Sequence, residues 1–529
     1  MAQTSWSVEN GRLWVSRDGG TKQLFLIKGV CYNPTPAGKG VLKNPLGREN
    51  DVATSAIFWP RDLPLLRSMG ANAIRVYDMQ NGDGTALILD QDPFFVEAWN
   101  GGNDPIYTLL SIWIPPETFG ADNIDTLVNR YKTAALKHKD APALLGFSVG
   151  AEFNAKFDNG DDNAVRAANP AKYWSNFKRL VDELRTALGT TKIITSGIIE
   201  NYDFVRDAIQ KDIQLDLWGV DLYKTATSFE AAWQSYDAAV TTAYTELKRP
   251  AEAPRPPLLV GEFGVPVSCR DGSVVKELPE GTGAKTMGAV TSYLSTAWST
   301  IRNHGIGGFV FEWTDEWWKQ DSGGCGGTLT SDSPGDGTQR CTPSAHDGAA
   351  ALMENKYFPD GGGYLDEEWF GLNAIIPAAS GLDQLRPRAA YDFLKNTLWK
   401  ESQPTAGTTA LDVPANSRIH INGFTNSATW EQKITVQVPG HDATSWTGSG
   451  YQANHCVGRR TIPALPQRQL LTISMEFSRG GNFEPLNIVW RNFMLPGLEG
   501  YVVGGEDPGH AGGTAAWNTV LFIYWARGY

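Results

Sequence analysis

The sequence contains no long apolar segment and little positive charge. No apolar run approaches the roughly 18 residues that a helix needs to cross a bilayer, so we expect no membrane-spanning segment. The 46 Lys and Arg residues are outnumbered by 58 Asp and Glu residues, which gives a formal net charge of −12. Because nucleic-acid binding depends on clustered basic residues that meet phosphates, we expect no nucleic-acid partner. A neutral ligand fits this composition better.

Cysteine is rare, and histidine forms no cluster. The five cysteines show no C-x-x-C spacing, so we predict no zinc site, no thioredoxin-like motif and no cofactor. The stretch 157–163 is rich in carboxylates but lacks the spacing of a calcium loop, so no metal is predicted there. Cys325 and Cys341 flank a Gly-, Ser- and Asp-rich stretch and are predicted to form a disulfide, which favours an oxidising compartment. No secretory signal is visible at the start of the sequence, so secretion is a hypothesis.

Short apolar runs alternate with amphipathic helical stretches from residue 24 to residue 320. This alternation is typical of βαβ units that build a parallel sheet. Helices are predicted between the runs, for example over 59–70, 123–139, 170–189 and 287–305. Eight runs resemble strands, which predicts an α/β fold with a (β/α)8 TIM barrel over 1–400; they are 24–32, 72–78, 107–114, 144–150, 192–198, 215–223, 257–264 and 306–313.

The composition changes beyond the barrel. The stretch 401–410, ESQPTAGTTA, predicts a linker, and the β-rich runs that follow predict a β-sandwich accessory domain over 411–529. Trp430, Trp446 and Trp517 favour a carbohydrate-binding face on this domain. A purely structural domain is the alternative interpretation.

Long stretches follow four of the predicted strands. Active sites of TIM barrels lie at the carboxyl ends of the strands, so these stretches are expected to wall a cleft. They are 33–56, 78–104, 264–285 and 314–366. The chain also holds 19 Trp, 17 Tyr and 22 Phe, and aromatic faces either stack on sugar rings or fill cores. For the aromatic residues near the predicted rim we expect sugar stacking for one or two and packing for the rest; they are Tyr32, Trp113, Trp317 and Trp318.

Two glutamates end predicted strands on opposite sides of the barrel mouth. Glu152 ends the fourth strand in FSVGAEFN, and Glu262 ends the seventh in LLVGEFG. Glycoside hydrolysis with retention of configuration needs two carboxyl groups about 5–5.5 Å apart, one ionised and one protonated. The pair therefore predicts a retaining glycosidase site with Glu262 as nucleophile and Glu152 as general acid/base.

The sequence resembles the superfamily of retaining TIM-barrel glycosidases with glutamates on strands 4 and 7, which includes cellulases, β-mannanases and β-1,3-glucanosyltransferases. The resemblance covers residues 24–400, and its marks include KGVCYNP, GAEFN, WGVDLY, GEFG, FEW and EEWFGLNAI. It implies that Arg75 keeps the nucleophile ionised, that Tyr223 hydrogen-bonds the nucleophile, and that Trp313 floors the sugar that is attacked.

One residue departs from that pattern. The residue before the acid/base is usually Asn, which binds the sugar 2-hydroxyl, and here it is Ala151. Either another donor substitutes, with Asn33, Asn154 and Asn201 as candidates, or the substrate differs at C2. Other rim residues that we predict to contact substrate are Tyr32, Asp221, Glu312 and Trp317.

The leading hypothesis is an enzyme that hydrolyses a β-linked polysaccharide, with β-glucan as the first choice. Transglycosylation follows from the same site if a sugar hydroxyl replaces water. A non-catalytic carbohydrate-binding protein on a glycosidase scaffold is the competing class, motivated by Ala151 alone. Both glutamates, together with Arg75 and Tyr223, weigh against this competing class.

Overall fold

Two compact units make up the computed structural model of the chain, Met1–Trp399 and Lys400–Tyr529. No helix among the residues that the structure describes is long and apolar enough to cross a membrane. In the second unit the structure describes the strands named below, and in the first it describes residues 3–20, 22–37, 45–47, 57–77, 91–115, 117–157, 160–250, 253–271, 274–283, 286–317, 353–355, 363–365, 369–378 and 382–399.

The first unit is built on a ring of parallel strands, hydrogen-bonded in the order β10-β7-β6-β5-β4-β16-β13-β12-β11. Only Gly197 separates β10 from β11, so these two short strands occupy one position, through which the ring closes. The (β/α)8 barrel predicted from the sequence is therefore confirmed. The strands are β4 Ile27–Cys31, β5 Ala73–Arg75, β6 Tyr107–Ile112, β7 Leu144–Val149, β10 Ile193–Ser196, β11 Ile198–Ile199, β12 Trp218–Asp221, β13 Leu258–Phe263 and β16 Gly307–Val310.

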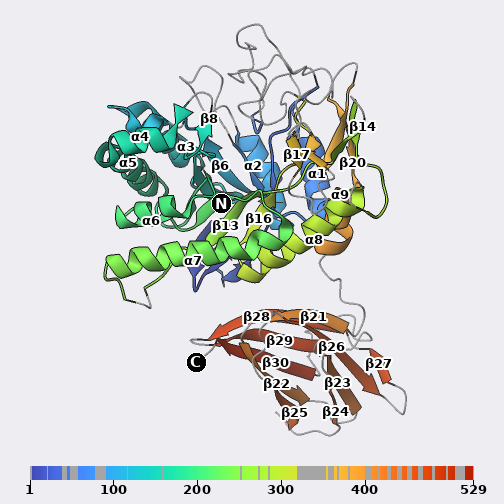
Figure 1. Ribbon diagram of the computed structural model, residues 1–529. Coiled ribbons are helices and arrows are strands. Elements are labelled where there is room, and N and C mark those ends of the chain that lie inside the picture. The colour runs from blue at the N-terminus through green and yellow to red at the C-terminus, as the bar shows by residue number, and fades with distance from the viewer. Residues whose placement is uncertain are drawn as a thin grey trace. The chain divides into compact units, whose positions relative to one another are not determined.

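Helices follow the barrel strands and surround the ring (Figure 1). The longest, α5, shows why they form: Tyr173, Phe177 and Leu184 recur at helical spacing and are buried. Asn169 caps its start by accepting a hydrogen bond from the Lys172 backbone N–H. The helices are α1 Trp59–Met69, α2 Asp92–Trp99, α3 Asp125–His138, α4 Asp162–Ala168, α5 Pro170–Leu188, α6 Tyr202–Gln210, α7 Phe229–Glu246, α8 Met287–His304 and α9 Ala389–Phe393.

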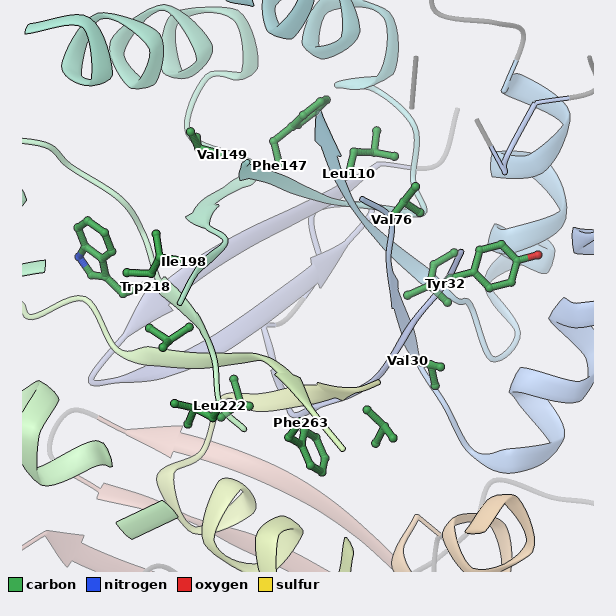
Figure 2. Packing of buried hydrophobic residues seen from close by; sticks show 14 of the residues in the cluster. Val30, Tyr32, Val76, Leu110, Phe147, Val149, Ile198, Trp218, Leu222 and Phe263 are labelled. Carbon is green, nitrogen blue, oxygen red and sulfur yellow. The ribbon is translucent and has the colours of Figure 1, made fainter. Parts of the chain in front are cut away.

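Side chains of the barrel strands alternate between the inside of the ring and the surrounding helices. On β6, Leu110 and Ile112 belong to the large hydrophobic cluster that packs against the helices. Tyr107 and Leu109, on the same strand, belong to the cluster inside the ring. Figure 2 shows side chains of the outer cluster projecting away from the ring of strands. The alternation therefore decides which strand residues can reach the barrel mouth.

A three-stranded antiparallel sheet closes the amino-terminal end of the barrel; its strands are β1 Thr4–Glu9, β2 Arg12–Arg17 and β3 Gln23–Phe25. Trp6 packs edge-to-face against Tyr107, and its indole N–H donates to the Leu144 carbonyl oxygen at 3.0 Å. The single strand predicted over 24–32 is wrong, because β3 pairs with β2 and only Ile27–Cys31 joins the barrel. With this end filled, an active site belongs at the carboxyl end of the strands.

The chain after the barrel folds back over that carboxyl end. The Glu312 backbone N–H donates to the Phe370 carbonyl oxygen. Further on, the fully buried Arg388 donates two hydrogen bonds, of 2.7 and 2.6 Å, to the carboxylate of Asp315. Two-stranded sheets accompany these loops: β8 Lys156–Phe157 with β9 Gly160–Asp161, β14 Ser268–Asp271 with β15 Val274–Glu277, β17 Met353–Asn355 with β18 Gly363–Leu365, and β19 Asn373–Ile376 with β20 Gln384–Pro387.

The second unit consists of two five-stranded antiparallel sheets, which confirms the β-sandwich predicted from the sequence. One sheet has the order β21-β26-β23-β24 with β27 on β26, and the other has the order β25-β22-β30-β29-β28. The first strand begins at Thr408, inside the stretch expected to be linker. The strands are β21 Thr408–Val413, β22 Ser417–Thr425, β23 Glu431–Gln437, β24 Thr444–Gly448, β25 His455–Ile462, β26 Gln469–Ser478, β27 Phe483–Pro485, β28 Asn487–Leu495, β29 Leu498–Glu506 and β30 Thr519–Arg527.

Candidate active site

Glu262 lies on β13 and is held from two sides. Only 5% of the residue is exposed. The Tyr223 hydroxyl donates to Oε2 at 2.7 Å, and Arg75 Nη1 lies 3.2 Å from Oε1. Burial and the neighbouring Glu262 raise the pKa of Tyr223 well above its ordinary value, so Tyr223 stays protonated and keeps donating at neutral pH. Each carboxylate oxygen of Glu262 therefore has a fixed partner.

Glu152 occupies a turn rather than a strand. It lies three residues beyond the end of β7, it is partly exposed, and its φ is +47°. Residues other than glycine rarely adopt this left-handed conformation. Such conformations cost roughly 1–3 kcal/mol and concentrate at functional sites, where the surrounding structure enforces them.

Tyr131 enforces the turn that carries Glu152. This tyrosine belongs to α3, and its buried hydroxyl accepts hydrogen bonds from the backbone N–H groups of Gly150 at 2.9 Å and Ile112 at 3.2 Å. The Ser111 hydroxyl donates to the Gly150 carbonyl oxygen at 3.1 Å. One side chain thus ties the tips of β6 and β7 together, and Gly150 is fixed at both its N–H and its C=O.

The chain beyond Glu152 is anchored in turn. The Ala155 N–H donates to the Glu152 carbonyl oxygen, and the Asp162 N–H donates to the Ala155 carbonyl oxygen. The Asp162 carboxylate is fully buried and accepts a 2.5 Å hydrogen bond from the Tyr173 hydroxyl. Burial raises the pKa of Asp162 to about 6, and the bond from Tyr173 opposes that rise. Asp162 therefore links the loop that follows Glu152 to α5.

A third carboxylate, Asp221, shares the guanidinium that touches Glu262. Arg75 donates from Nη1 to Asp221 Oδ1 at 2.6 Å and from Nη2 to Oδ2 at 3.4 Å, and both side chains are buried. Burial and the neighbouring Glu262 raise the pKa of Asp221, and the charge of Arg75 opposes that rise. This pair needs space, because a Cβ at Gly261 would lie 2.3 Å from Asp221 Oδ1 and a Cβ at Gly197 would lie 2.6 Å from Arg75 Nη2.

The structure brings Glu152, Asp221 and Glu262 together at the carboxyl end of the barrel. One carboxylate oxygen from each residue lies within 4.8 Å of the other two. Arg75 bridges Asp221 and Glu262, and Glu152 is the partly exposed member of the three. The arrangement offers one fixed carboxylate facing one carboxyl group that solvent can reach.

Phe311 and Phe370 pack around Tyr223, the hydrogen-bond donor to Glu262, whereas Trp313 belongs to another cluster. Trp313 is fully buried in the cluster that packs against the helices, with its ring 6.3 Å from that of Tyr391 on α9. The ring that faces the site from the eighth strand position is Phe311, 6.1 Å from Tyr223. Phe370, from the segment that folds back over the barrel, lies 5.3 Å from Phe311. Phe311, rather than Trp313, therefore packs beside the tyrosine that hydrogen-bonds Glu262.

Several other residues predicted to bind substrate serve the scaffold. Tyr32 points outward from the ring (Figure 2), and its hydroxyl donates to the buried Asp62 on α1 at 2.9 Å. Asn154 accepts a hydrogen bond from the Ile199 N–H at 2.9 Å, which ties the Glu152 turn to β11. Asn201 caps α6. The structure does not bring Tyr32, Asn154 or Asn201 to the carboxylate cluster as free donors.

The remaining predicted residues lie on the loops after the first and eighth strand positions. The Asn33 side-chain amide donates to Glu316 Oε1 at 3.0 Å, which joins these two loops. Asn33, Glu312 and Trp317 are all buried, at 7%, 1% and 8% exposed. In this arrangement they brace the wall of the mouth rather than reach into solvent.

Several residues that build the site were not predicted from the sequence. Gly197 and Gly261 make room for the ion pair, and Tyr131 reaches the strand tips from a helix. Phe311 and Phe370 carry the rings beside Tyr223. An aromatic residue two positions before Trp313 in FEW was the one available signal for Phe311.

Some predictions fall on residues outside those that the structure describes. Cys325, Cys341 and Trp318 lie there, as do Asp158 and Asn159 of the carboxylate-rich stretch 157–163. The predicted disulfide therefore stays a prediction.

No family model matches the sequence. Two curated 1,3-beta-glucanosyltransferases of Saccharomyces cerevisiae, GAS2 and GAS5, are each 23% identical to it. The first match runs over 259 residues, 47% of this chain and 42% of the relative, and the second runs over 315 residues, 55% and 53%. The chain thus spans about half the length of the curated relatives it matches.

Solved structures match both units at low similarity. A beta-glucuronidase of Bacteroides uniformis is 13% identical, with a TM-score of 0.43, covering 99% of this chain and 48% of that one. A high-affinity mannose-binding lectin of Ralstonia solanacearum is 25% identical, with a TM-score of 0.18, covering 23% of this chain and 97% of the lectin. The curated matches confirm the resemblance predicted from the sequence, because β-1,3-glucanosyltransferases are members of that superfamily: this chain is similar to enzymes that act on β-glycosidic bonds.

Proposed function

We propose that the chain is a retaining enzyme that cleaves a β-linked polysaccharide, with β-glucan as its substrate class. One observation carries the proposal: a carboxylate oxygen of Glu152 lies within 4.8 Å of a carboxylate oxygen of Glu262 at the carboxyl end of a (β/α)8 barrel, which suits the close spacing of a retaining pair. Retention needs about 5–5.5 Å between the two carboxyl groups. Inversion needs about 6.5–9.5 Å, because a water molecule must fit between the base and the sugar.

In the first step Glu262 attacks the anomeric carbon C1. A C1–O bond to Glu262 forms as the bond from C1 to the leaving oxygen breaks, and that oxygen takes the proton of Glu152. Arg75 and Tyr223 suit this step, because they hold the two oxygens of Glu262 in place. A nucleophile fixed before the reaction avoids the entropy cost of orienting it in the transition state.

In the second step Glu152, now ionised, takes a proton from an incoming hydroxyl. The oxygen of that hydroxyl bonds to C1, and Glu262 leaves as a carboxylate, so the configuration at C1 is restored. Partial exposure of Glu152 suits this exchange, since the residue must meet a leaving sugar in one step and water or an acceptor in the next.

Transfer to a sugar hydroxyl is the second candidate function. The similarity to two 1,3-beta-glucanosyltransferases favours it, because a glucanosyltransferase passes its glycosyl group to a carbohydrate rather than to water. Hydrolysis and transfer share the glycosyl-enzyme and differ only in the hydroxyl that resolves it.

A polysaccharide is too large to cross a membrane, so we also propose extracellular action, which the predicted Cys325–Cys341 disulfide suits. The β-sandwich is proposed to be an accessory domain that holds glycan.

Incubation with a panel of β-1,3-, β-1,4- and β-1,6-linked glucans and β-mannan tests the proposal, with products identified by mass and linkage. We expect shortened or lengthened chains from a β-glucan and none from the Glu262→Ala protein. Asp216→Asn is a matched control, because that carboxylate lies at the start of β12, below the site, and pairs with Arg185. Products from none of the glycans, or equal products from Glu262→Ala, would exclude the proposed site.

A further inference from the structure

One tryptophan near Glu152 is exposed. Trp113 is 42% exposed and directly follows β6. Every other tryptophan whose burial the structure describes is buried or partly buried. Leaving so large an apolar ring in water forfeits the free energy that burial provides, so an exposed tryptophan beside a catalytic candidate calls for a ligand.

The ring of Trp113 faces the barrel mouth. Ile112 and Ile114, on either side of it, are buried in the cluster that packs against the helices. Because successive side chains of an extended chain point to opposite faces, Trp113 points the other way, along the line of Leu109 and Ser111. The Ser111 hydroxyl on this inner face reaches the Gly150 carbonyl oxygen. Trp113 is therefore the next inward-facing residue after Ser111, at the carboxyl end of β6, and Ser111 supports the turn that carries Glu152.

The backbone segments that carry Trp113 and Glu152 are hydrogen-bonded to the same tyrosine, Tyr131. Ile112 pairs with Val149 in the parallel register of β6 and β7, which puts Trp113 beside Gly150. The Tyr131 hydroxyl accepts from the N–H groups of both Ile112 and Gly150. The same bridge thus fixes the residue before Trp113 and the turn that carries Glu152.

This position selects one side of the cleaved bond. Glu152 meets the leaving oxygen in the first step and the incoming hydroxyl in the second, whereas Glu262, on β13, meets C1. A flat ring next to Glu152 therefore lies on the side of the leaving and accepting sugar. A lone tryptophan is far too small for a protein partner, which needs about 1,000 Å² of interface.

From this geometry we infer that Trp113 is a binding platform for a neutral pyranose ring of the leaving or accepting glycan. The C–H groups on one face of the sugar meet the electron-rich face of the indole. The inference deepens the proposed function and rests on it. On this inference Trp113 raises the ratio of transfer to hydrolysis, because an acceptor sugar bound next to the glycosyl-enzyme competes with water for it.

The test uses laminaribiosyl fluoride as donor, because its fluoride leaving group needs no sugar platform, and laminarihexaose as acceptor. For Trp113→Ala we expect the ratio of transfer to hydrolysis to fall about tenfold, with Trp113→Phe retaining most of it. Leu136→Ala is the control, since Leu136 is also exposed (55%) but lies on α3, away from the mouth. An unaltered ratio in Trp113→Ala, with the donor consumed, overturns the inference and leaves the proposed function intact.

A binding measurement separates the two proposals. Laminarihexaose is titrated by calorimetry into Glu262→Ala and into Glu262→Ala combined with Trp113→Ala, neither of which turns it over. We expect the affinity to fall about tenfold in the double variant. Equal affinities, or no binding by either protein, contradict the platform. If the affinity falls as expected although the unaltered chain consumes no fluoride, Trp113 holds sugar and the catalytic proposal alone fails.

Discussion

The two glutamates of the site occupy opposite kinds of surroundings. Glu262 sits on a strand, 5% exposed, with Arg75 and Tyr223 on its two oxygens. Glu152 sits in a left-handed turn and is partly exposed. The difference matches what two roles require. A nucleophile must stay ionised and aimed at one carbon, whereas an acid/base must pass protons to and from groups that come and go.

The supporting structure follows the same division. Glu262 is held directly, through its carboxylate, by charged and polar side chains. Glu152 is positioned through its backbone, because Tyr131, Ser111 and Asp162 fix the chain before and after it. Contacts to the carboxylate of Glu262 favour its charged form, whereas the backbone contacts around Glu152 set the position of that residue. The predictions below test this distinction.

Glu262→Ala should have the largest effect. No other described carboxylate has the same position, so no glycosyl-enzyme can form, and kcat should fall by at least about 10⁴-fold while the protein stays folded. Initial rates on a β-glucan oligosaccharide, with circular dichroism as the folding control, check this. Activity close to that of the unaltered chain would show that Glu262 is not the nucleophile.

Glu152→Gln should have a smaller effect that depends on the leaving group. A sugar leaving group needs a proton, so we expect a loss of about 10²–10⁴-fold on oligosaccharides. Release of fluoride needs no proton, so the first step on a glycosyl fluoride should suffer much less. Equal losses on the two donors in single-turnover kinetics would remove Glu152 from the role of acid.

Asp221→Asn tests whether the third carboxylate acts through its charge. Without that charge Arg75 loses its strongest partner, and we expect kcat/KM to fall about 10–100-fold. The site also loses one negative charge near Glu152, so Glu152 should deprotonate at lower pH and the alkaline limb of the pH–rate profile should move down. A slower enzyme with an unmoved alkaline limb would mean that Asp221 is neutral in the working enzyme.

Ala151→Asn should reduce the rate on a β-glucan by a few-fold. Ala151 is 8% exposed. A larger side chain at so buried a position overpacks its surroundings, which costs about 1–3 kcal/mol. Steady-state kinetics on the same oligosaccharide check the expectation. A clear gain in rate would instead show that the pocket has merely lost a hydrogen bond to the sugar.

Asp162→Asn tests, through the free energy of unfolding, how Asp162 anchors the loop that follows Glu152. The folded protein holds the pKa of Asp162 at about 6, above the ordinary 3.8, so between pH 4 and pH 6 the folded state binds more protons than the unfolded state. The free energy of unfolding should therefore fall as pH rises from below this window to above it, by on the order of 3 kcal/mol. Urea unfolding at several pH values should show this fall in the unaltered chain and not in Asp162→Asn. The same fall in both proteins would place the effect elsewhere.

The sequence predicted the barrel. The prediction that Tyr32 contacts substrate did not take strand alternation into account: Cys31 lies in the cluster inside the ring, so Tyr32, the next residue, points outward to Asp62. Trp313 could not be placed this way. Phe311 belongs to the cluster inside the ring whereas Trp313, two residues on, lies in the outer one, so the alternation breaks between them.

Long-range contacts account for the rest. Tyr131 reaches two strand tips from a helix, and Phe370 reaches Tyr223 from the far end of the barrel unit. Neither contact leaves a periodic or spacing signal in the sequence. The left-handed conformation of Glu152 also has no signature, because the turn is held by contacts to Tyr131, Ser111 and Ile199 on other segments. Local patterns predict elements, whereas the site depends on where the elements meet.

Proton NMR of the first product tests the central claim most directly. The claim is that two carboxylates within 4.8 Å work by double displacement. Spectra recorded during the first minutes of cleavage, before the sugar ring opens and re-equilibrates, distinguish the two anomers. We expect the new reducing end to appear first as the β-anomer. Initial release of the α-anomer would mean inversion, and would contradict both the role of Glu262 as nucleophile and the reading of the carboxylate spacing.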